Sequence, residues 1–470
     1  MRMAGHRIWG FRSLSPKLVA GVALWGQVVS PSLGERAQVY LSALIRLDTS
    51  NPPGNETRVA EYLRSVAEAH GIECELLGHD PSRLNFVARL RGDGRERPLL
   101  LLAHSDVVPA ERAQWSVDPF AAVLKDGALF GRGAEDTKDL LAAELAVLVE
   151  LKASGRRLNR DVILLAEADE EAASLGMRWM AENAWDRIDA AFALNEGGSI
   201  TQTPEGIRVY RIQTAEKIPT RIRLVAHGTA GHGAAPRPDN AVVRLARATV
   251  RLAETDQPVR LNATARAYLK GLSSLPAYSW LAPLLPRLDR QATVLQTANQ
   301  IRAHDPDLDT LLRTTVTPTI LRAGQQVNVI PATAEAFVDV RRLPEETREE
   351  VLARMRRIIN DPSVDVALLE GPQMPPAPSS PLDSRMYQAM ERVLREADPQ
   401  ALIVPYLSRG ASDSAFLRAK GVAAYGIPLF LIEKEGDRSH GNDERRSLDN
   451  LRRGTELLWK IVLAVASDSQ

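Results

Sequence analysis

The feature that most constrains the fold is an alternation of short apolar runs with helix-forming segments in the first half of the chain. Apolar runs at residues 85–90, 99–103 and 162–166 have the length and composition of buried strands. Residues 140–151, between the last two runs, are typical of a helix. Strands that alternate with helices predict βαβ units around a mostly parallel sheet flanked by helices.

Histidine and carboxylate side chains follow these apolar runs, where the predicted strands end. Active sites of α/β proteins are assembled in the loops at the carboxyl ends of parallel strands. Histidine and carboxylate are also the ligand types of hydrolytic metal sites. We therefore consider together seven side chains that lie at strand ends, before a predicted helix or in a polar loop: His104, Asp106, Asp136, Glu170, Glu171, Glu196 and His440.

Taken singly, each of these residues has a structural explanation. His104 fits a surface loop as well as a metal site in which Asp106 accepts the second imidazole N–H. Asp136 can cap the N-terminus of the following helix, or bridge two metals about 3.5–4 Å apart. Glu196 fits a strand-end turn, and His440 fits a solvated loop.

Glu170 and Glu171 are the most informative pair. Adjacent carboxylates at a strand end repel each other unless a cation is present. One of them can bind a metal while the other transfers a proton, although an exposed acidic loop is the alternative. The coincidence of all these groups in one chain favours a metal site.

Composition and missing motifs exclude other classes. Lys+Arg and Asp+Glu number 59 each, so the chain lacks the basic excess of a nucleic-acid binder. Cys74 is the single cysteine, which rules out an intramolecular disulfide and a Cys-based metal site. The sequence contains no Gly-x-Ser-x-Gly, phosphate-loop or His-Glu-x-x-His motif.

At 470 residues the chain predicts more than one domain. His440 follows Glu196 by about 240 residues, so a common site requires an inserted domain between them. We predict an α+β insertion at 215–336, serving as a lid and dimerisation domain, with strands at 221–227, 317–321 and 334–340. The catalytic α/β domain would comprise 35–214 and 337–470. Residues 256–314 form a variable stretch with several prolines.

Residues 1–34 are ambiguous. Basic residues precede an apolar run at 18–29, as in a signal peptide, but glycines interrupt the run and no Ala-x-Ala site follows. We interpret 1–34 as a signal or a disordered N-terminus, which leaves both cytoplasmic and exported locations open. No later segment has both the length and the apolarity of a transmembrane helix.

The segments LLLLAHSDVVP, GRGAEDTKD, LLAEADEE, ALNEGG and SHGNDER, preceded by DTSNPPG at 48–54, resemble a known family. It is the di-zinc metallopeptidase family of aminoacylases, glutamate carboxypeptidases, succinyl-diaminopimelate desuccinylases and carnosinase-like dipeptidases. The long stretch at 256–314 is most similar to the vacuolar carboxypeptidase-like and N-acyl-amino-acid hydrolase branch.

The resemblance implies roles for individual residues. One zinc would be bound by His104, Asp136 and Glu196, and the other by Asp136, Glu171 and His440. Glu170 would be the general base and acid, and Asp106 would orient His104. The family also implies a cis peptide bond after Asp136. Asp139 stands where the family commonly has glycine, and residues 408–413 are a loose version of a substrate-side loop, so specificity is left open.

The resemblance also implies roles in the inserted domain. His232, in GTAGHG, would stabilise the oxyanion, in some members from the partner subunit. Asn328, in VNVIP, would contact the substrate, and Arg322 is a candidate for holding a substrate carboxylate. A homodimer through the inserted domain is compatible with this pattern.

The expected function is zinc-dependent hydrolysis of an amide bond in N-acyl amino acids or short peptides with a free carboxylate. Co²⁺ or Mn²⁺ could replace the two Zn²⁺ ions. The partners would be small-molecule or short-peptide substrates, with no nucleic acid and no membrane span. The alternatives are an aminopeptidase or a succinyl-diaminopimelate desuccinylase-like deacylase. An inactive binding protein on this fold is disfavoured, because every ligand position and the base are present.

Overall fold

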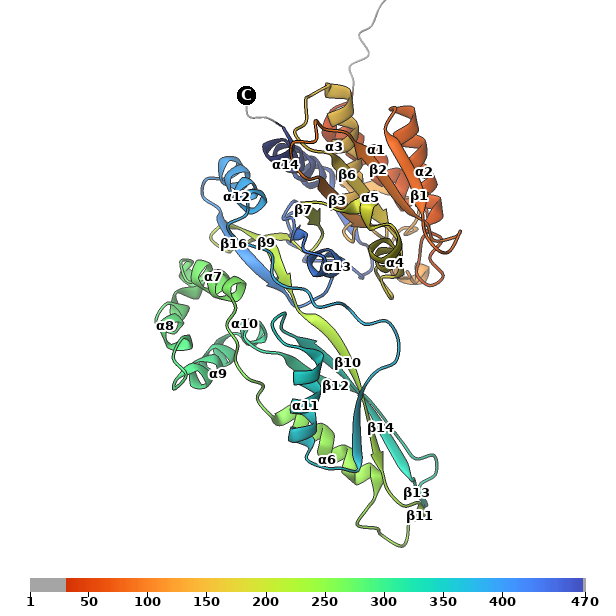
Figure 1. Cartoon of the computed structure of the whole chain (residues 1–470), viewed down its shortest axis with the longest axis vertical. Coiled ribbons are helices and arrows are strands. Elements are labelled where there is room, and N and C mark those ends of the chain that lie inside the picture. Colours follow the sequence, from red (N-terminus) through yellow and green to blue (C-terminus); the bar gives the residue numbers. More distant parts are fainter. Residues whose placement is uncertain (1–30, 468–470) are drawn as a thin grey trace, which may run out of the picture.

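The computed structural model describes residues 31–467 (Figure 1). The expected signal-like segment therefore lies almost entirely outside the described residues. Its last residues begin a helix, α1 (Leu33–Ile45), in which Ser32 and Glu35 form a capping box. Within 31–467 no helix combines the length and apolarity needed to cross a bilayer.

A nine-stranded sheet forms the core of the larger part. Its order is β1-β2-β6-β3-β7-β17-β9-β16, with β8 paired to β9. The central strands β6, β3, β7 and β17 run parallel, as do β9 and β16, which confirms the predicted fold class. The strands are β1 (Glu73–Leu77), β2 (Asn85–Leu90), β3 (Leu99–His104), β6 (Val162–Glu167), β7 (Phe192–Asn195), β8 (Ser199–Gln202), β9 (Arg208–Glu216), β16 (Leu402–Ser408) and β17 (Ala423–Gly426).

Helices cover both faces of this sheet because its central strands are apolar on both sides. Leu99 and Leu101 of β3 pack into one core, while Leu100 and Leu102 pack into the core on the other face. The first core is covered by α1, α2 (Thr57–Ala69), α3 (Lys138–Ser154), α12 (Arg385–Ala397) and α14 (Leu448–Ala466). The second is covered by α4 (Leu175–Asn183), α5 (Trp185–Ile188) and α13 (Ser414–Ala419).

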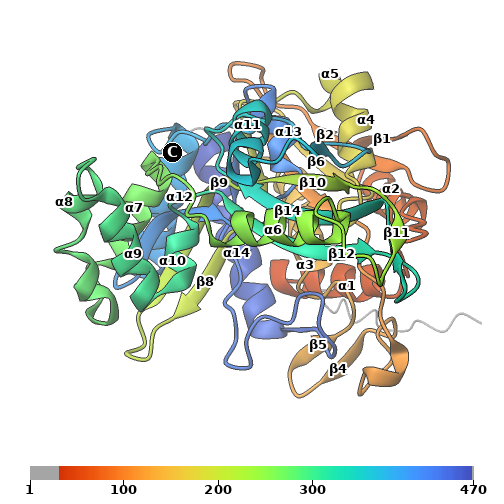
Figure 2. The same ribbon diagram turned by 90° about the horizontal axis from the view of Figure 1, so that it is seen from below.

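A four-stranded antiparallel sheet forms the smaller part, in the order β12-β14-β10-β15. Its strands are β10 (Ile218–His227), β12 (Thr315–Ala323), β14 (Thr333–Arg342) and β15 (Val364–Leu368), and α6 (Ala241–Glu254) and α11 (Arg348–Ile359) pack on it (Figure 2). The expected boundary at residue 336 thus falls inside β14. The pairing of β14 and β15 with β10 carries this sheet to residue 368.

The remaining elements are short. Residues 256–314, expected as a variable stretch, contain α7 (Ala263–Leu272), α8 (Leu285–Leu288), α9 (Val294–His304), α10 (Pro306–Thr310) and a 3-10 turn at Pro276–Leu281. These helices pack against β9 and β16, at one side of the molecule (Figure 2). Two strands, β11 (Gly231–His232) and β13 (Val329–Ile330), pair at the far tip of the smaller part (Figure 1). A separate small sheet consists of β4 (Val123–Lys125), β5 (Ala128–Phe130) and β18 (Arg445–Ser447). A further 3-10 turn spans Arg112–Gln114.

Candidate metal centre

Three neighbouring parallel strands bring four of the predicted residues to one edge of the large sheet. His104 is the last residue of β3, Glu170 and Glu171 follow β6, and Glu196 directly follows β7. Because β6, β3 and β7 are adjacent and parallel, their carboxyl ends meet at that edge.

Asp136 lies between the two histidines. Its Oδ1 atom is 3.0 Å from Nε2 of His104, and its Oδ2 atom is 3.2 Å from Nε2 of His440. The helix-cap alternative for Asp136 is not observed, because α3 begins at Lys138 and Thr137 occupies the cap position. The Asp136–Thr137 peptide bond is cis, as the resemblance implied.

The other carboxylates complete the cluster. Both carboxylate oxygens of Glu171 lie 3.2 Å from Nε2 of His440. Oε2 of Glu196 lies 3.8 Å from Nε2 of His104. Two groups have ligand atoms within 4.8 Å of one another: His104, Asp136 and Glu171, and His104, Glu170 and Glu196. Glu170, expected as the base, is therefore also within reach of a metal at this cluster.

The electrostatics of the cluster fit a bound cation. Burial raises the pKa of Glu196 to about 8, and the nearby carboxylates of Asp136 and Glu171 add to this shift. Burial also raises the pKa of Glu170 well above its usual range, with Glu196 adding to the effect. The charge of His104 opposes the rise in both pKa values, and divalent metals bind such mixed nitrogen and oxygen donor sets. The cluster therefore fits a metal site.

Asp106 is fully buried and joins His104 to the loop that carries the glutamates. Its carboxylate accepts hydrogen bonds from the backbone N–H groups of Glu170 (3.1 Å) and Glu171 (3.2 Å). Nδ1 of His104 lies 3.0 Å from the main-chain oxygen of Asp106 and 3.5 Å from its carboxylate. The expected orienting role agrees with this geometry and stays a prediction.

Two further residues hold the site, and sequence reasoning assigned neither a role. Asn51 donates its side-chain amide to Asp106 (2.8 Å) and to Asp169 (2.9 Å). Glu444 accepts hydrogen bonds from the backbone N–H groups of Glu135 (2.6 Å) and Asp136 (3.1 Å). Asn51 lies in the segment DTSNPPG and Glu444 in SHGNDER. Their positions in these two motifs were the sequence feature that could have identified them.

The structure does not bring the three predicted residues of the smaller part to the cluster. His232 is in β11 and Asn328 directly precedes β13, at the far tip of the small sheet (Figure 1). Arg322, in β12, lies 3.6 Å from Glu335 and stacks on the ring of Phe337. Contact with the cluster would require a domain movement or a second subunit.

Other arginines do reach the site. A cavity of about 370 Å³ is lined by Glu170, Glu171 and His440 and also by Arg178, Arg221 and Arg341. Arg341 donates from Nε to Asp339 (3.0 Å), whereas the Arg221 side chain has no hydrogen bond or ion pair with any residue of 31–467. Sequence reasoning missed Arg221 and Arg341 because charged residues that alternate along a strand look solvent-facing, and it gave Arg178, in α4, no role.

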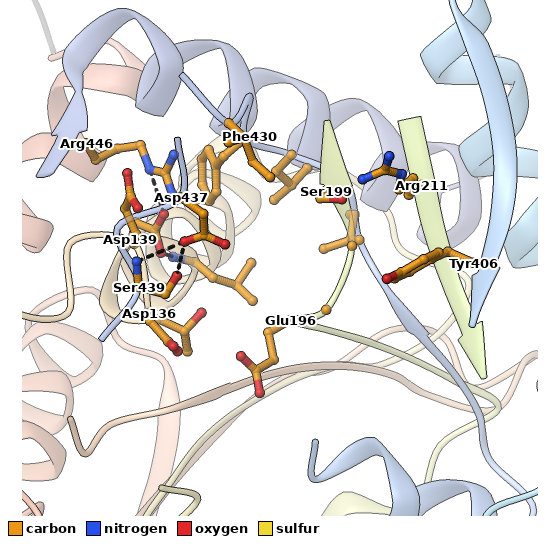
Figure 3. Close-up of a pocket in the computed structure, with 18 residues that line it drawn as sticks. Asp136, Asp139, Glu196, Ser199, Arg211, Tyr406, Phe430, Asp437, Ser439 and Arg446 are labelled. Atoms are coloured by element: carbon orange, nitrogen blue, oxygen red, sulfur yellow. Dashed lines mark hydrogen bonds and ion pairs between the residues drawn. The ribbon is translucent and has the colours of Figure 1, made fainter. Parts of the chain in front are cut away.

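A second cavity, of about 380 Å³, adjoins the cluster at Asp136 and Glu196 (Figure 3). Asp139 and Arg446 line it on one side, and Arg211 and Tyr406 line it on the other (Figure 3). Nε of Arg446 donates to the buried carboxylate of Asp139 over 2.9 Å, and its guanidinium lies over the ring of Phe430. The cluster thus adjoins both an arginine-lined cavity and a partly apolar one.

Residues 100–464 match the peptidase family M20/M25/M40. The chain belongs to this family. It is therefore a metal-dependent hydrolase, as the motifs predicted.

Individual M20 relatives agree with this assignment. The chain is 28% identical to the N-fatty-acyl-amino acid synthase/hydrolase PM20D1 of Homo sapiens, over 90% of this chain and 85% of that protein. It is 26% identical to a probable carboxypeptidase S-like protein of Dictyostelium discoideum, over 82% of this chain and 76% of that protein. The fold matches the crystal structure of an M20 metallo-carboxypeptidase from Sulfolobus solfataricus, with a TM-score of 0.66 and 18% identity. The match covers 90% of this chain and 98% of that chain.

Proposed function

We propose that this M20 enzyme hydrolyses the amide bond of N-acyl amino acids or short peptides that carry a free carboxylate. The observation that carries the proposal is the position of the cluster beside a cavity lined by Arg178, Arg221 and Arg341. Guanidinium groups bind carboxylates through charge-assisted hydrogen bonds. A carboxylate held in this cavity would leave the amide carbonyl of a short substrate at the cluster.

His104, Asp136 and Glu196 would hold one metal, and Asp136, Glu171 and His440 the other. Zn²⁺ is the proposed ion, and Co²⁺ or Mn²⁺ accept the same donors. When bound, such ions polarise the amide carbonyl and ease deprotonation of water at neutral pH.

Glu170 is the proposed general base and acid. Its carboxyl group borders both the cluster and the arginine-lined cavity. It would take a proton from the attacking water and return that proton to the leaving amine. Asp106 would keep Glu170 in position through the backbone hydrogen bond at residue 170, and would keep His104 in its ligating orientation.

Arg221 and Arg341, rather than Arg322, are the proposed carboxylate anchors, since they border the same cavity as Glu170. His232 and Asn328 would reach the substrate after closure of the smaller part or from the partner in a homodimer. An aminopeptidase that needs no free carboxylate is disfavoured because it would leave the arginine-lined cavity unused.

The test is a hydrolysis screen of the zinc-loaded protein with N-acyl amino acids, dipeptides and the corresponding C-terminal amides. We expect turnover of substrates with a free carboxylate, and a large loss when that group is amidated. Equal turnover of both forms would overturn the carboxylate requirement. Faster turnover of dipeptides with a free amine and an amidated C-terminus would support an aminopeptidase instead.

A further inference from the structure

The cavity at Asp136 and Glu196 is separated from a third cavity by a wall that is one chain segment thick. The third cavity has a volume of about 420 Å³ and is lined by residues of β8, β9, α14 and the segment 429–433. We name the two cavities the inner cavity (at Asp136 and Glu196) and the outer cavity. The segment 429–433 is extended and attached to β8, because Ile200 N–H donates to Phe430 and Ile432 N–H donates to Ile200.

Side chains of this wall alternate between the two cavities. Phe430 and Ile432 line the inner cavity, whereas Leu431 and Glu433 line the outer one. Strand β9 shows the same alternation, with Arg211 facing inward and Tyr210 facing outward. Successive residues of an extended chain point to opposite faces, so the two cavities lie on opposite faces of this sheet edge.

Leu429 is the exception, because it lines both cavities and is the only residue of 31–467 to do so. Its exposed fraction is 3%, so Leu429 is buried where the two cavities approach each other.

The inner cavity can receive an apolar group. Leu140, Ile427, Phe430 and Ile432 contribute apolar surface to it. Of its two arginines, Arg446 pairs with Asp139, and Arg211 lies over the rings of Tyr268 and Tyr406. If the substrate carboxylate lies among the arginines of the cavity at Glu170, the inner cavity, which adjoins the cluster at Asp136 and Glu196, remains to receive the acyl group.

We propose that the inner cavity binds the acyl chain of the substrate and that Leu429 sets the longest chain it accepts. This inference rests on the proposed function. Truncating Leu429 would join the inner and outer cavities and extend the acyl site across the sheet edge.

The test measures binding, so that it does not depend on turnover. N-acyl-L-phenylalanines from acetyl to hexadecanoyl would be titrated calorimetrically into zinc-loaded Glu170→Gln protein. Each buried methylene should raise affinity about fourfold, until the chain reaches Leu429 and the affinity levels off. In Leu429→Ala the affinity should keep rising for at least about two further carbons. The variant should therefore bind the longer conjugates about tenfold more tightly than the protein with Leu429 intact.

Leu431→Ala is the matched control, since Leu431 lines only the outer cavity. Alone it should leave the affinity series unchanged, and combined with Leu429→Ala it should reduce the gain for long chains. If Leu429→Ala fails to fold, Leu429→Val should give a smaller shift in the same direction.

An affinity that levels off at the same length in the folded Leu429 variants, or that does not grow with chain length at all, would overturn the inference. The proposed function has a separate readout in the turnover of the protein with Glu170 intact. Absence of turnover together with the expected affinity series would reject the hydrolase proposal and leave the acyl site standing.

Discussion

The Oδ2 atom of Asp136 lies 3.2 Å from Nε2 of His440, although most of the chain separates the two residues in sequence. The other oxygen of the same carboxylate faces His104. One side chain therefore contributes to both halves of the candidate centre.

Asp136→Asn should remove both metals, because the amide has one neutral oxygen where the carboxylate offers two charged ones. Metal analysis after reconstitution with zinc should find the wild type loaded at both positions and the variant below one ion per chain. Asp443→Asn is the control, since Asp443 is close to His440 in sequence but binds Ser116. Full loading of Asp136→Asn would contradict the bridging assignment.

Glu170→Gln should keep its metal and lose turnover by a factor of about 10² to 10⁴, the usual contribution of a positioned general base. The amide preserves the shape of the side chain but cannot accept the proton of water. Metal content and turnover should be measured on the same sample. Near-normal turnover by a fully metal-loaded variant would rule out the proton-transfer role.

Arg341→Ala should raise KM for substrates with a free carboxylate, with a loss of about 1.5–3 kcal/mol in kcat/KM. The methyl ester of the same substrate should be affected far less, because it carries no charge at that end. Arg322→Ala serves as the control on the same sheet, since Arg322 pairs with Glu335 away from the cluster. A stronger effect of Arg322→Ala would restore that residue as the anchor.

The buried pair of Asp139 and Arg446 should be sensitive to the loss of one partner. Asp139→Leu would leave the Arg446 guanidinium without its carboxylate, at a cost of about 3–5 kcal/mol in the free energy of unfolding. The double variant Asp139→Leu with Arg446→Met should recover most of that loss. Unfolding by denaturant would measure both, and additive losses would show that the pair is not coupled.

Lys217, between β9 and β10, should make stability depend on pH. Burial lowers its pKa to about 7 in the folded protein, against about 10.4 in an unfolded chain. Between these values the unfolded chain binds the extra proton, so the free energy of unfolding rises with pH. Below pH 7 Lys217 is protonated in both states. Burial of its charge then lowers the free energy of unfolding by its full amount, at most about 5 kcal/mol.

Lys217→Met should therefore be more stable than the wild type near pH 7, with the difference shrinking towards about pH 10. Urea unfolding with chelator in all samples would measure this difference. The exposed Lys270→Met variant should show no such convergence. A constant difference for Lys217→Met across the range would exclude the titration of Lys217 as its cause.

Much of the site could be predicted because its parts are local. Apolar runs identify β3, β6 and β7, and the polar residues that follow them must meet if the strands are parallel neighbours. The end of the smaller sheet could not be predicted in the same way. It depends on the pairing of β14 and β15 with β10, strands that are far apart in the sequence. Likewise, nothing local distinguishes Arg341, which lines the cavity, from Arg322, which does not.

The hydrogen bonds from the backbone of Glu135 and Asp136 to Glu444 have a consequence for biosynthesis. Chains grow at about 5–20 residues per second, so His440 and Glu444 emerge on the order of 15–60 s after Asp136. During that interval the large sheet can begin to form. The loop that carries Asp136 still lacks its hydrogen bonds to Glu444, and His440 is absent. The metal centre can therefore be completed only after His440 and Glu444 have been synthesised.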